Sequence, residues 1–187
     1  KRQEAAPHFA KAINALLHSL AMPHAAVQLN LEQNDAVKQN GIDTLAFLVK
    51  TNLGNSFSSI EKIASGGELS RIMLCVKAAI ADKATLPTLI FDEIDTGISG
   101  EIASKMGAVL QQLGSFMQVI SISHLPQIAG KGHHQFKVSK HTDGQRSYSA
   151  IKKLTNEERL LEIAAMISGD QVSETAIANA RVLLEIQ

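Results

Sequence analysis

Two short apolar runs, at 89–91 and 119–122, constrain the fold of this chain more than any other feature. Each run ends abruptly in polar residues, the acidic pair 92–93 after the first and Ser123-His124 after the second. Apolar residues at helical spacing between 102 and 113 predict a helix that connects the two runs. A strand, a helix and a second strand form a βαβ unit, and its right-handed crossover places both strands in one parallel sheet. The sequence therefore predicts an α/β fold around two buried parallel strands.

The first 24 residues predict an amphipathic helix. We expect this helix to end near Pro23, with Pro7 in its first turn or at a kink. Its apolar residues have a heptad-like spacing that an ordinary amphipathic helix and a coiled-coil helix share: Ala6, Phe9, Ile13, Leu16 and Leu20. Two heptads are too few to decide between these two interpretations.

Antiparallel structure is expected on both sides of the βαβ unit. Alternating apolar residues indicate strands at 27–31 and 45–49, separated by the turn signal Asn40-Gly41, and the polar stretch 51–65 is interpreted as a loop. After the unit, Asp143-Gly144 predicts a two-residue hairpin turn. Such a turn sets Val138 opposite Ser149.

Two helices are expected at the end of the chain. Thr155 and Glu158 have the spacing of a capping box that opens the first of them. Gly169 ends that helix, and Ser173 starts the second.

Charge and composition exclude several function classes. Lys and Arg number 18, as do Asp and Glu, so the formal net charge is zero, which argues against a basic nucleic-acid-binding tail and a polybasic membrane patch. Six Phe, one Tyr and no Trp are too few rings for a platform that stacks single-stranded bases. Cys75 is the only cysteine, which excludes an internal disulfide framework; we expect it to pack in the interior of a cytoplasmic protein. No apolar run has the length of a membrane-spanning helix.

The tetrapeptide Ser65-Gly66-Gly67-Glu68 stands where the polar stretch enters a predicted helix at 69–80. A helix N-terminus offers unpaired N–H groups and a partial positive charge, and glycines let the backbone approach an anion closely. Ser65 adds a hydroxyl group that can bond a phosphate oxygen. The pattern favours a phosphate-binding turn, but taken alone it also fits a flexible loop end with Ser65 as a simple helix cap.

Acidic and imidazole side chains follow the two predicted parallel strands. Ligands of open α/β sheets collect at the carboxyl ends of the strands, where the crossover places Glu93 and His124 together. Asp92 is suited to orient the Mg²⁺ shell, and Glu93 to polarise an attacking water. A neutral His124 could contact a terminal phosphate or order the water. Asp95 is interpreted as a turn-former or as a contact across an interface, and each residue alone also fits a structural role.

Three strings, in this order along the chain, resemble motifs of ATP-binding-cassette (ABC) ATPases. ASGGELSR at 64–71 resembles the signature motif, LIFDEIDTGISG at 89–100 resembles the Walker B strand with its D-loop, and SHLPQIA at 123–129 resembles the switch-histidine loop. In this detail they are similar to bacterial DNA repair and recombination proteins of the branch that includes the structural-maintenance-of-chromosomes (SMC) proteins. The resemblance covers essentially the whole chain, and Ser123 is a small departure because relatives often carry Thr there.

The resemblance implies a domain organisation. No G-x-x-x-x-G-K-[ST] phosphate loop occurs in the sequence. In this family the loop, called Walker A, lies in an N-terminal lobe that a long coiled coil separates from the C-terminal lobe. The chain is thus expected to be the C-terminal lobe of an ABC/SMC-type head, a parallel βαβ core with an added antiparallel hairpin and C-terminal helices. Residues 1–24 would be the stump of the coiled coil and 25–187 the lobe, with the Walker A lobe outside this chain.

The resemblance also implies cofactors, partners and roles for residues. ATP and Mg²⁺ are the expected cofactors, with Glu93 and His124 as catalytic residues and Asp92 as the Mg²⁺ residue, directly or through water. Five residues are expected to contact the nucleotide: Ser65, Gly66, Gly67, Glu68 and Asp95. The expected partners are the chain's own N-terminal lobe, a second copy joined through ATP, and DNA in the full-length protein. The chain alone is expected to be inactive.

Two other functions remain open, and a third fits less well. A docking module would use nucleotide as a switch for binding DNA or protein, with little catalysis of its own. A metal nuclease would use Asp92, Glu93, Asp95 and His124, which leaves the glycine motif without a role. A transporter ATPase is a poorer fit, because a helix and two strands, rather than a phosphate loop, precede the signature-like motif.

Overall fold

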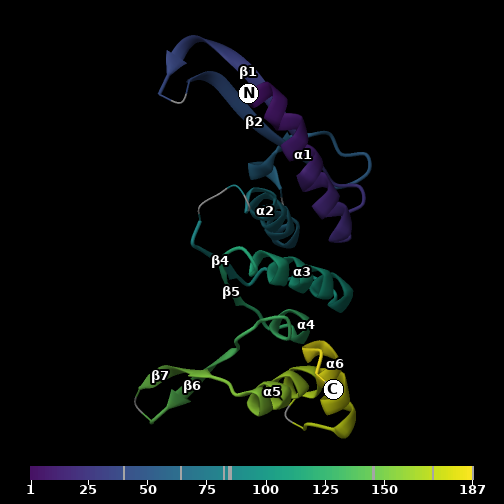
Figure 1. Cartoon of the computed structure of the whole chain (residues 1–187), viewed down its shortest axis with the longest axis vertical. Coiled ribbons are helices and arrows are strands. Elements are labelled where there is room, and N and C mark those ends of the chain that lie inside the picture. Colours follow the sequence, from purple (N-terminus) through teal and green to yellow (C-terminus); the bar gives the residue numbers. More distant parts are fainter. Residues whose placement is uncertain are drawn as a thin grey trace.

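The helices and strands follow one another along the long axis of the molecule, so that the chain forms an elongated stack of α/β units (Figure 1). The computed structural model describes all residues except 40, 64, 82, 84, 85, 145, 170 and 187. Parallel and antiparallel sheets are both present, which confirms the predicted α/β class. Among the described residues, no helix is long and apolar enough to cross a bilayer.

The first unit of the stack is a helix packed against a long antiparallel hairpin. α1 (Arg2–Ser19) lies beside β1 (Ala26–Lys38), and β1 pairs with β2 (Gly41–Lys50) in the expected antiparallel sense. The side chain of Asn14 fastens the helix to the hairpin, because its amide donates to Val27 O at 3.2 Å and its oxygen accepts from Val27 N at 2.7 Å. The helix position is therefore fixed by polar bonds as well as by apolar packing.

Two details of this unit differ from the prediction. α1 ends at Ser19 rather than near Pro23. Pro7 lies inside the helix beyond its first turn, which excludes the first of its two expected places and leaves the kink as a prediction. The polar stretch after β2 contains a short strand, β3 (Ser58–Ser59), and a 3₁₀ turn, η1 (Ile60–Lys62). Both elements are too short to show a hydrophobic period in the sequence. Asn40, half of the predicted turn, lies outside the described residues.

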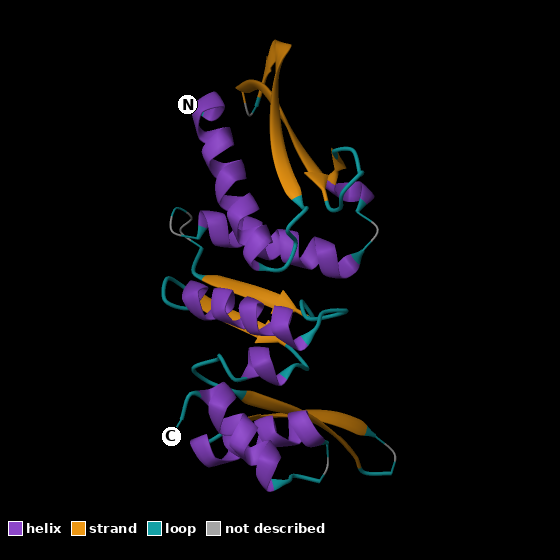
Figure 2. Cartoon of the chain, turned by 90° about the vertical axis from the view of Figure 1, so that its right-hand side faces the viewer, coloured by secondary structure: helices purple, strands orange, loops and turns teal. Residues whose placement is uncertain are grey.

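The central unit is the predicted βαβ arrangement. α2 (Gly66–Ile80) precedes β4 (Thr88–Asp92), and α3 (Gly100–Leu113) connects β4 to β5 (Gln118–Ile122). β4 and β5 are parallel, with Ile90 opposite Ile120, and α3 lies over one face of the pair (Figure 2). A short helix that the sequence analysis did not predict, α4 (Pro126–Ala129), follows β5.

The last unit combines a hairpin with two helices. β6 (Phe136–Thr142) pairs with β7 (Ser147–Lys153), and α5 (Asn156–Ser168) and α6 (Glu174–Leu184) follow. The capping box of α5 is confirmed. The predicted hairpin register is wrong, because Val138 faces Ile151 rather than Ser149.

The error in the hairpin register has a local cause in the loop. The loop is two residues longer than predicted, running from 143 to 146. Asp143 Oδ1 accepts a hydrogen bond from Arg146 N at 3.0 Å, and Asp143 N donates to Arg146 O at 3.2 Å. A shift of two residues keeps every side chain on its face, so the alternation of the strands is unaffected.

The main core spans the first two units and includes Ile13, Ile72 and Met106, all fully buried. Cys75 packs in this core as expected, and burial raises the pKa of its thiol to about 12. A smaller core joins α5 and α6 around Ile163 and Ala180.

The parallel strands are buried on one face only, which corrects the prediction of fully buried strands. Leu89 and Phe91 point into the core, whereas Ile90, Ile120 and Ile122 on the opposite face are 60%, 43% and 53% exposed. No second layer of described residues covers this face, so these strands present isoleucines that a parallel sheet normally buries.

Candidate functional site

The signature-like tetrapeptide forms the first turn of α2. Ser65 is the N-cap, and its Oγ accepts a hydrogen bond from Glu68 N at 3.4 Å. Ser65 and Gly66 are exposed, and a Cβ placed on Gly66 would meet no atom within 4 Å. The turn therefore presents an open helix N-terminus, the arrangement that binds anions.

Gly67 brings this turn against the loop that follows β4. A Cβ on Gly67 would lie 2.9 Å from Thr96 O, too close for any side chain unless the backbone moves. The two motifs lie 25 or more residues apart in sequence but touch through this glycine, and both lie on the side of the molecule where the parallel strands end (Figure 2). The contact explains why glycine occupies this position.

Asp92 and Glu93 stand at the carboxyl end of β4, as predicted. Both residues are exposed. Among the described residues, neither carboxylate has a hydrogen bond or an ion pair, so both are available to a ligand. The charge of two adjacent free carboxylates is uncompensated, which favours the binding of a cation or a proton donor at this end of the strand.

Glu93 has an unusual backbone. Its φ is +47°, in the left-handed region that non-glycine residues rarely adopt. Hydrogen bonds hold it there, because Glu93 N donates to Ile122 O at 3.1 Å and Glu93 O accepts from Thr96 N at 3.3 Å and from Thr96 Oγ1 at 3.1 Å. Backbone strain of this kind is concentrated at functional sites, where surrounding contacts maintain it.

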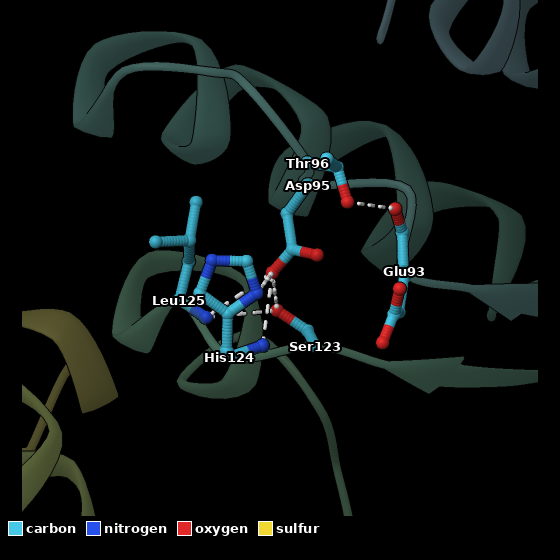
Figure 3. Close-up of polar contacts among 6 residues, drawn as sticks. All are labelled: Glu93, Asp95, Thr96, Ser123, His124 and Leu125. Carbon is cyan, nitrogen blue, oxygen red and sulfur yellow. Dashed lines mark hydrogen bonds and ion pairs between the residues drawn. The ribbon is translucent and has the colours of Figure 1, made fainter. Parts of the chain in front are cut away.

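Asp95 is the polar centre of the region (Figure 3). The residue is only 1% exposed, and its Oδ2 accepts hydrogen bonds from Ser123 Oγ at 2.5 Å, His124 N at 2.9 Å and Leu125 N at 3.2 Å. Burial by itself raises the carboxyl pKa, but the bonds from Ser123 and the His124 backbone outweigh it, so the pKa of Asp95 lies below its ordinary value of 3.8. The loop after β4 is thereby joined to the loop after β5.

His124 follows β5 on the same edge of the sheet, as the crossover predicts. Its Nδ1 lies 3.2 Å from Asp95 Oδ2, while its side chain is 67% exposed. The structure therefore brings together four predicted positions: the glycine turn, Glu93, Asp95 and His124. The Asp95 carboxylate faces its own chain rather than solvent, so this geometry favours a positioning role over the contact with nucleotide that we expected.

Two residues that help to build this site were not predicted from the sequence to do so. Thr96 contacts both Gly67 and Glu93, and Ser123 donates the shortest hydrogen bond to Asp95. Both are hydroxyl residues beside predicted site residues, and this proximity was the only sequence signal. Their roles depend on two loops that meet in space and are almost 30 residues apart in sequence.

The residues present fit Mg²⁺ and a phosphate group, but only in part. Exposed carboxylate oxygens are the ligands that Mg²⁺ prefers, and an open helix N-terminus suits a phosphate. The described residues contain no group of three or more His, Cys, Asp or Glu side chains arranged around one metal position. Mg²⁺ commonly completes its shell with waters and substrate phosphates, so one carboxylate from this chain is a sufficient contribution.

Sequence comparison shows that this chain is similar to bacterial DNA repair proteins. It is 40% identical over 186 residues to DNA repair protein RecN of Haemophilus influenzae, and 42% identical over 175 residues to that of Vibrio cholerae. These alignments cover 99% and 93% of this chain but only 33% and 32% of the relatives. The chain thus spans about one third of the length of these relatives. No family model matches it.

Structure comparison identifies the fold. The Smc head domain of Pyrococcus yayanosii, solved with a coiled coil and joint, matches with a TM-score of 0.66 at 23% identity, over 87% of this chain and 29% of that chain. A chain from a structural study of ATP-driven dimerization and DNA-stimulated activation of SMC ATPases matches with a TM-score of 0.59 at 21% identity, over 91% of this chain and 99% of that one. The fold is therefore the one found in SMC head domains.

Proposed function

We propose that this chain is the C-terminal lobe of a split ATPase head. It is similar to RecN DNA repair proteins over about one third of their length, and it has the fold of SMC head domains. In this proposal the complete protein hydrolyses ATP in the repair of DNA double-strand breaks and in recombination. One observation carries the proposal: the loop 93–97 contacts both the α2 N-terminal turn and the loop that holds His124. Three ATPase-like motifs thus meet in one place.

The large exposed surface area of the chain supports the proposal that a second lobe packs against it. A compact monomer of this mass exposes about 8,700 Å², whereas this chain exposes 12191 Å². The excess includes the isoleucine face of β4 and β5 and a hairpin face with Val138 and Ile151, 64% and 72% exposed. We assign the isoleucine face to the chain's own N-terminal lobe, which would carry the phosphate loop.

The three exposed polar side chains at the ends of β4 and β5 each have a role in this proposal. Asp92 holds Mg²⁺ directly or through a water, and Glu93 accepts a proton from the attacking water or orients it. When bound, Mg²⁺ neutralises the phosphate charge that develops during transfer to water. His124 stands at the same edge, where it would contact the terminal phosphate or order the attacking water.

The α2 turn serves a second head in the proposal. Ser65, Gly66 and Gly67 offer a hydroxyl and helix N–H groups to the γ-phosphate of ATP held by another copy, with Glu68 completing the turn. ATP then joins two heads, and its hydrolysis separates them. α1 continues into a coiled coil in this account, so that head closure moves the coiled coils and the DNA that the full-length protein binds.

ATP turnover by separate and mixed lobes tests the proposal. We expect no turnover by this chain or by a chain carrying the N-terminal lobe, and turnover when the two are mixed. Glu93→Gln should reduce that turnover by at least about 100-fold, while the control Glu157→Gln, an exposed glutamate on α5, should not. Turnover by this chain alone that Glu93→Gln abolishes would contradict a split site. A mixture that assembles and stays inactive would favour the docking module.

A further inference from the structure

The hydrogen bonds of Asp95 are concentrated on one oxygen. Oδ2 accepts from Ser123 Oγ, His124 N and Leu125 N and lies 3.2 Å from His124 Nδ1, whereas Oδ1 is buried and has no partner among the described residues. A buried carboxylate oxygen without a hydrogen-bond partner is uncommon in folded proteins. Oδ2 thus receives all three hydrogen bonds that the Asp95 carboxylate accepts from described residues, and the His124 ring lies beside the same oxygen.

The position of Nδ1 restricts the protonation of the His124 ring. A neutral imidazole carries its proton on either Nδ1 or Nε2, and the other nitrogen then has a lone pair. A lone pair on Nδ1 would lie 3.2 Å from the negative Asp95 carboxylate. That arrangement is repulsive, and the fully buried side chain of Asp95 is poorly screened by water. A proton on Nδ1 turns the repulsion into attraction.

We propose that Asp95 is a positioning residue that holds His124 as the Nδ1–H tautomer, with Nε2 as the nitrogen available to a ligand. The proposal deepens the proposed function, on which it rests only for the identity of that ligand. Asp95 thereby acts through His124 and not by touching nucleotide. Ser123 and the backbone N–H groups of 124 and 125 keep the carboxylate in place.

The tautomer decides what His124 can do. With Nδ1 protonated, a neutral ring offers only a lone pair at Nε2, which accepts a hydrogen bond from water. Contact with a phosphate oxygen requires a donor at Nε2, and hence the doubly protonated imidazolium. Of the two roles expected for a neutral His124, the Asp95 contact favours the ordering of water.

The proposal is tested by ¹⁵N NMR of the histidine rings in the 187-residue chain without nucleotide. Long-range ¹H–¹⁵N correlations distinguish the two neutral tautomers, and the His124→Gln variant identifies the His124 signals. At a pH where the ring is neutral, we expect the Nδ1–H form in at least about tenfold excess. Asp95→Ala removes the acceptor and should shift His124 toward the Nε2–H form that solvated imidazoles prefer.

Two further variants keep the test decisive. Ser123→Ala removes one donor to Asp95 without changing its charge, and His124 should remain Nδ1–H. Asp95→Asn keeps the side-chain shape and serves if Asp95→Ala fails to fold; we expect it to reduce the Nδ1–H excess. An Nε2–H ring in the wild-type chain, or a tautomer that Asp95→Asn leaves unchanged, overturns the proposal. These NMR results do not depend on ATP turnover. If the mixed lobes fail to hydrolyse ATP, the tautomer of His124 can still be the one proposed, so the two failures are distinguishable.

Discussion

Glu93 combines an exposed carboxylate with a left-handed backbone, a conformation that costs a non-glycine residue about 1–2 kcal/mol. Glycine at this position should relieve the strain, because glycine adopts a positive φ without a steric cost. We predict that Glu93→Gly is more stable than Glu93→Ala by about 1 kcal/mol in urea unfolding of the chain. Both variants should lack turnover in the mixed lobes. A Gly variant less stable than the Ala variant would show that the position is unstrained.

Asp95 should make the chain sensitive to acid. Its pKa in the folded chain lies below its ordinary value of 3.8, so its ionised form is stabilised by folding. That stability is fully present above about pH 4 and is lost as the pH falls through the lower folded pKa. We predict that the free energy of unfolding falls less between pH 6 and about pH 3 in Asp95→Asn than in the wild type. Equal slopes in denaturant titrations at these pH values would contradict this assignment.

At the scale of elements, the α2 turn and the loop 93–97 are held together by the Gly67–Thr96 contact. Gly67→Ala places a Cβ 2.9 Å from Thr96 O, whereas Gly66→Ala meets nothing within 4 Å. We predict that Gly67→Ala lowers the free energy of unfolding by about 1–3 kcal/mol. Gly66→Ala should be neutral or stabilising by up to about 1 kcal/mol, because alanine favours the helix. Equal effects of the two substitutions in urea unfolding would show that the contact is loose.

Elements whose signals are local were the most predictable from the sequence. The capping box at Thr155 and Glu158, the Ser65 cap and the parallel pair β4–β5 all follow from residues close in sequence or from the crossover rule. The register of β6 and β7 did not follow, because a side-chain bond within the loop set its length. The burial and partners of Asp95 also depend on a distant loop, so sequence placed this residue in the site but could not assign its contacts.

At the scale of the whole molecule, the isoleucine face of β4 and β5 should bind the N-terminal lobe. Replacement of Ile120 and Ile122 by Thr keeps the β-branched shape and removes apolar area. We predict that the double variant weakens association with a chain carrying that lobe by at least about tenfold in isothermal titration calorimetry. Val182→Thr, on α6 at 75% exposure, is the matched control and should bind normally. Unchanged affinity of the double variant would place the lobe interface elsewhere.

We expect each ATP site to combine Glu93 of one head with Ser65 of another, and complementation between inactive heads tests this arrangement. Heads assembled from both lobes would carry either Ser65→Arg or Glu93→Gln in this chain, and each should be inactive alone. A 1:1 mixture should recover on the order of a quarter of the wild-type ATP turnover, because half the two-fold dimers are mixed and each has one intact site. A mixture as inactive as its two components would contradict a shared site.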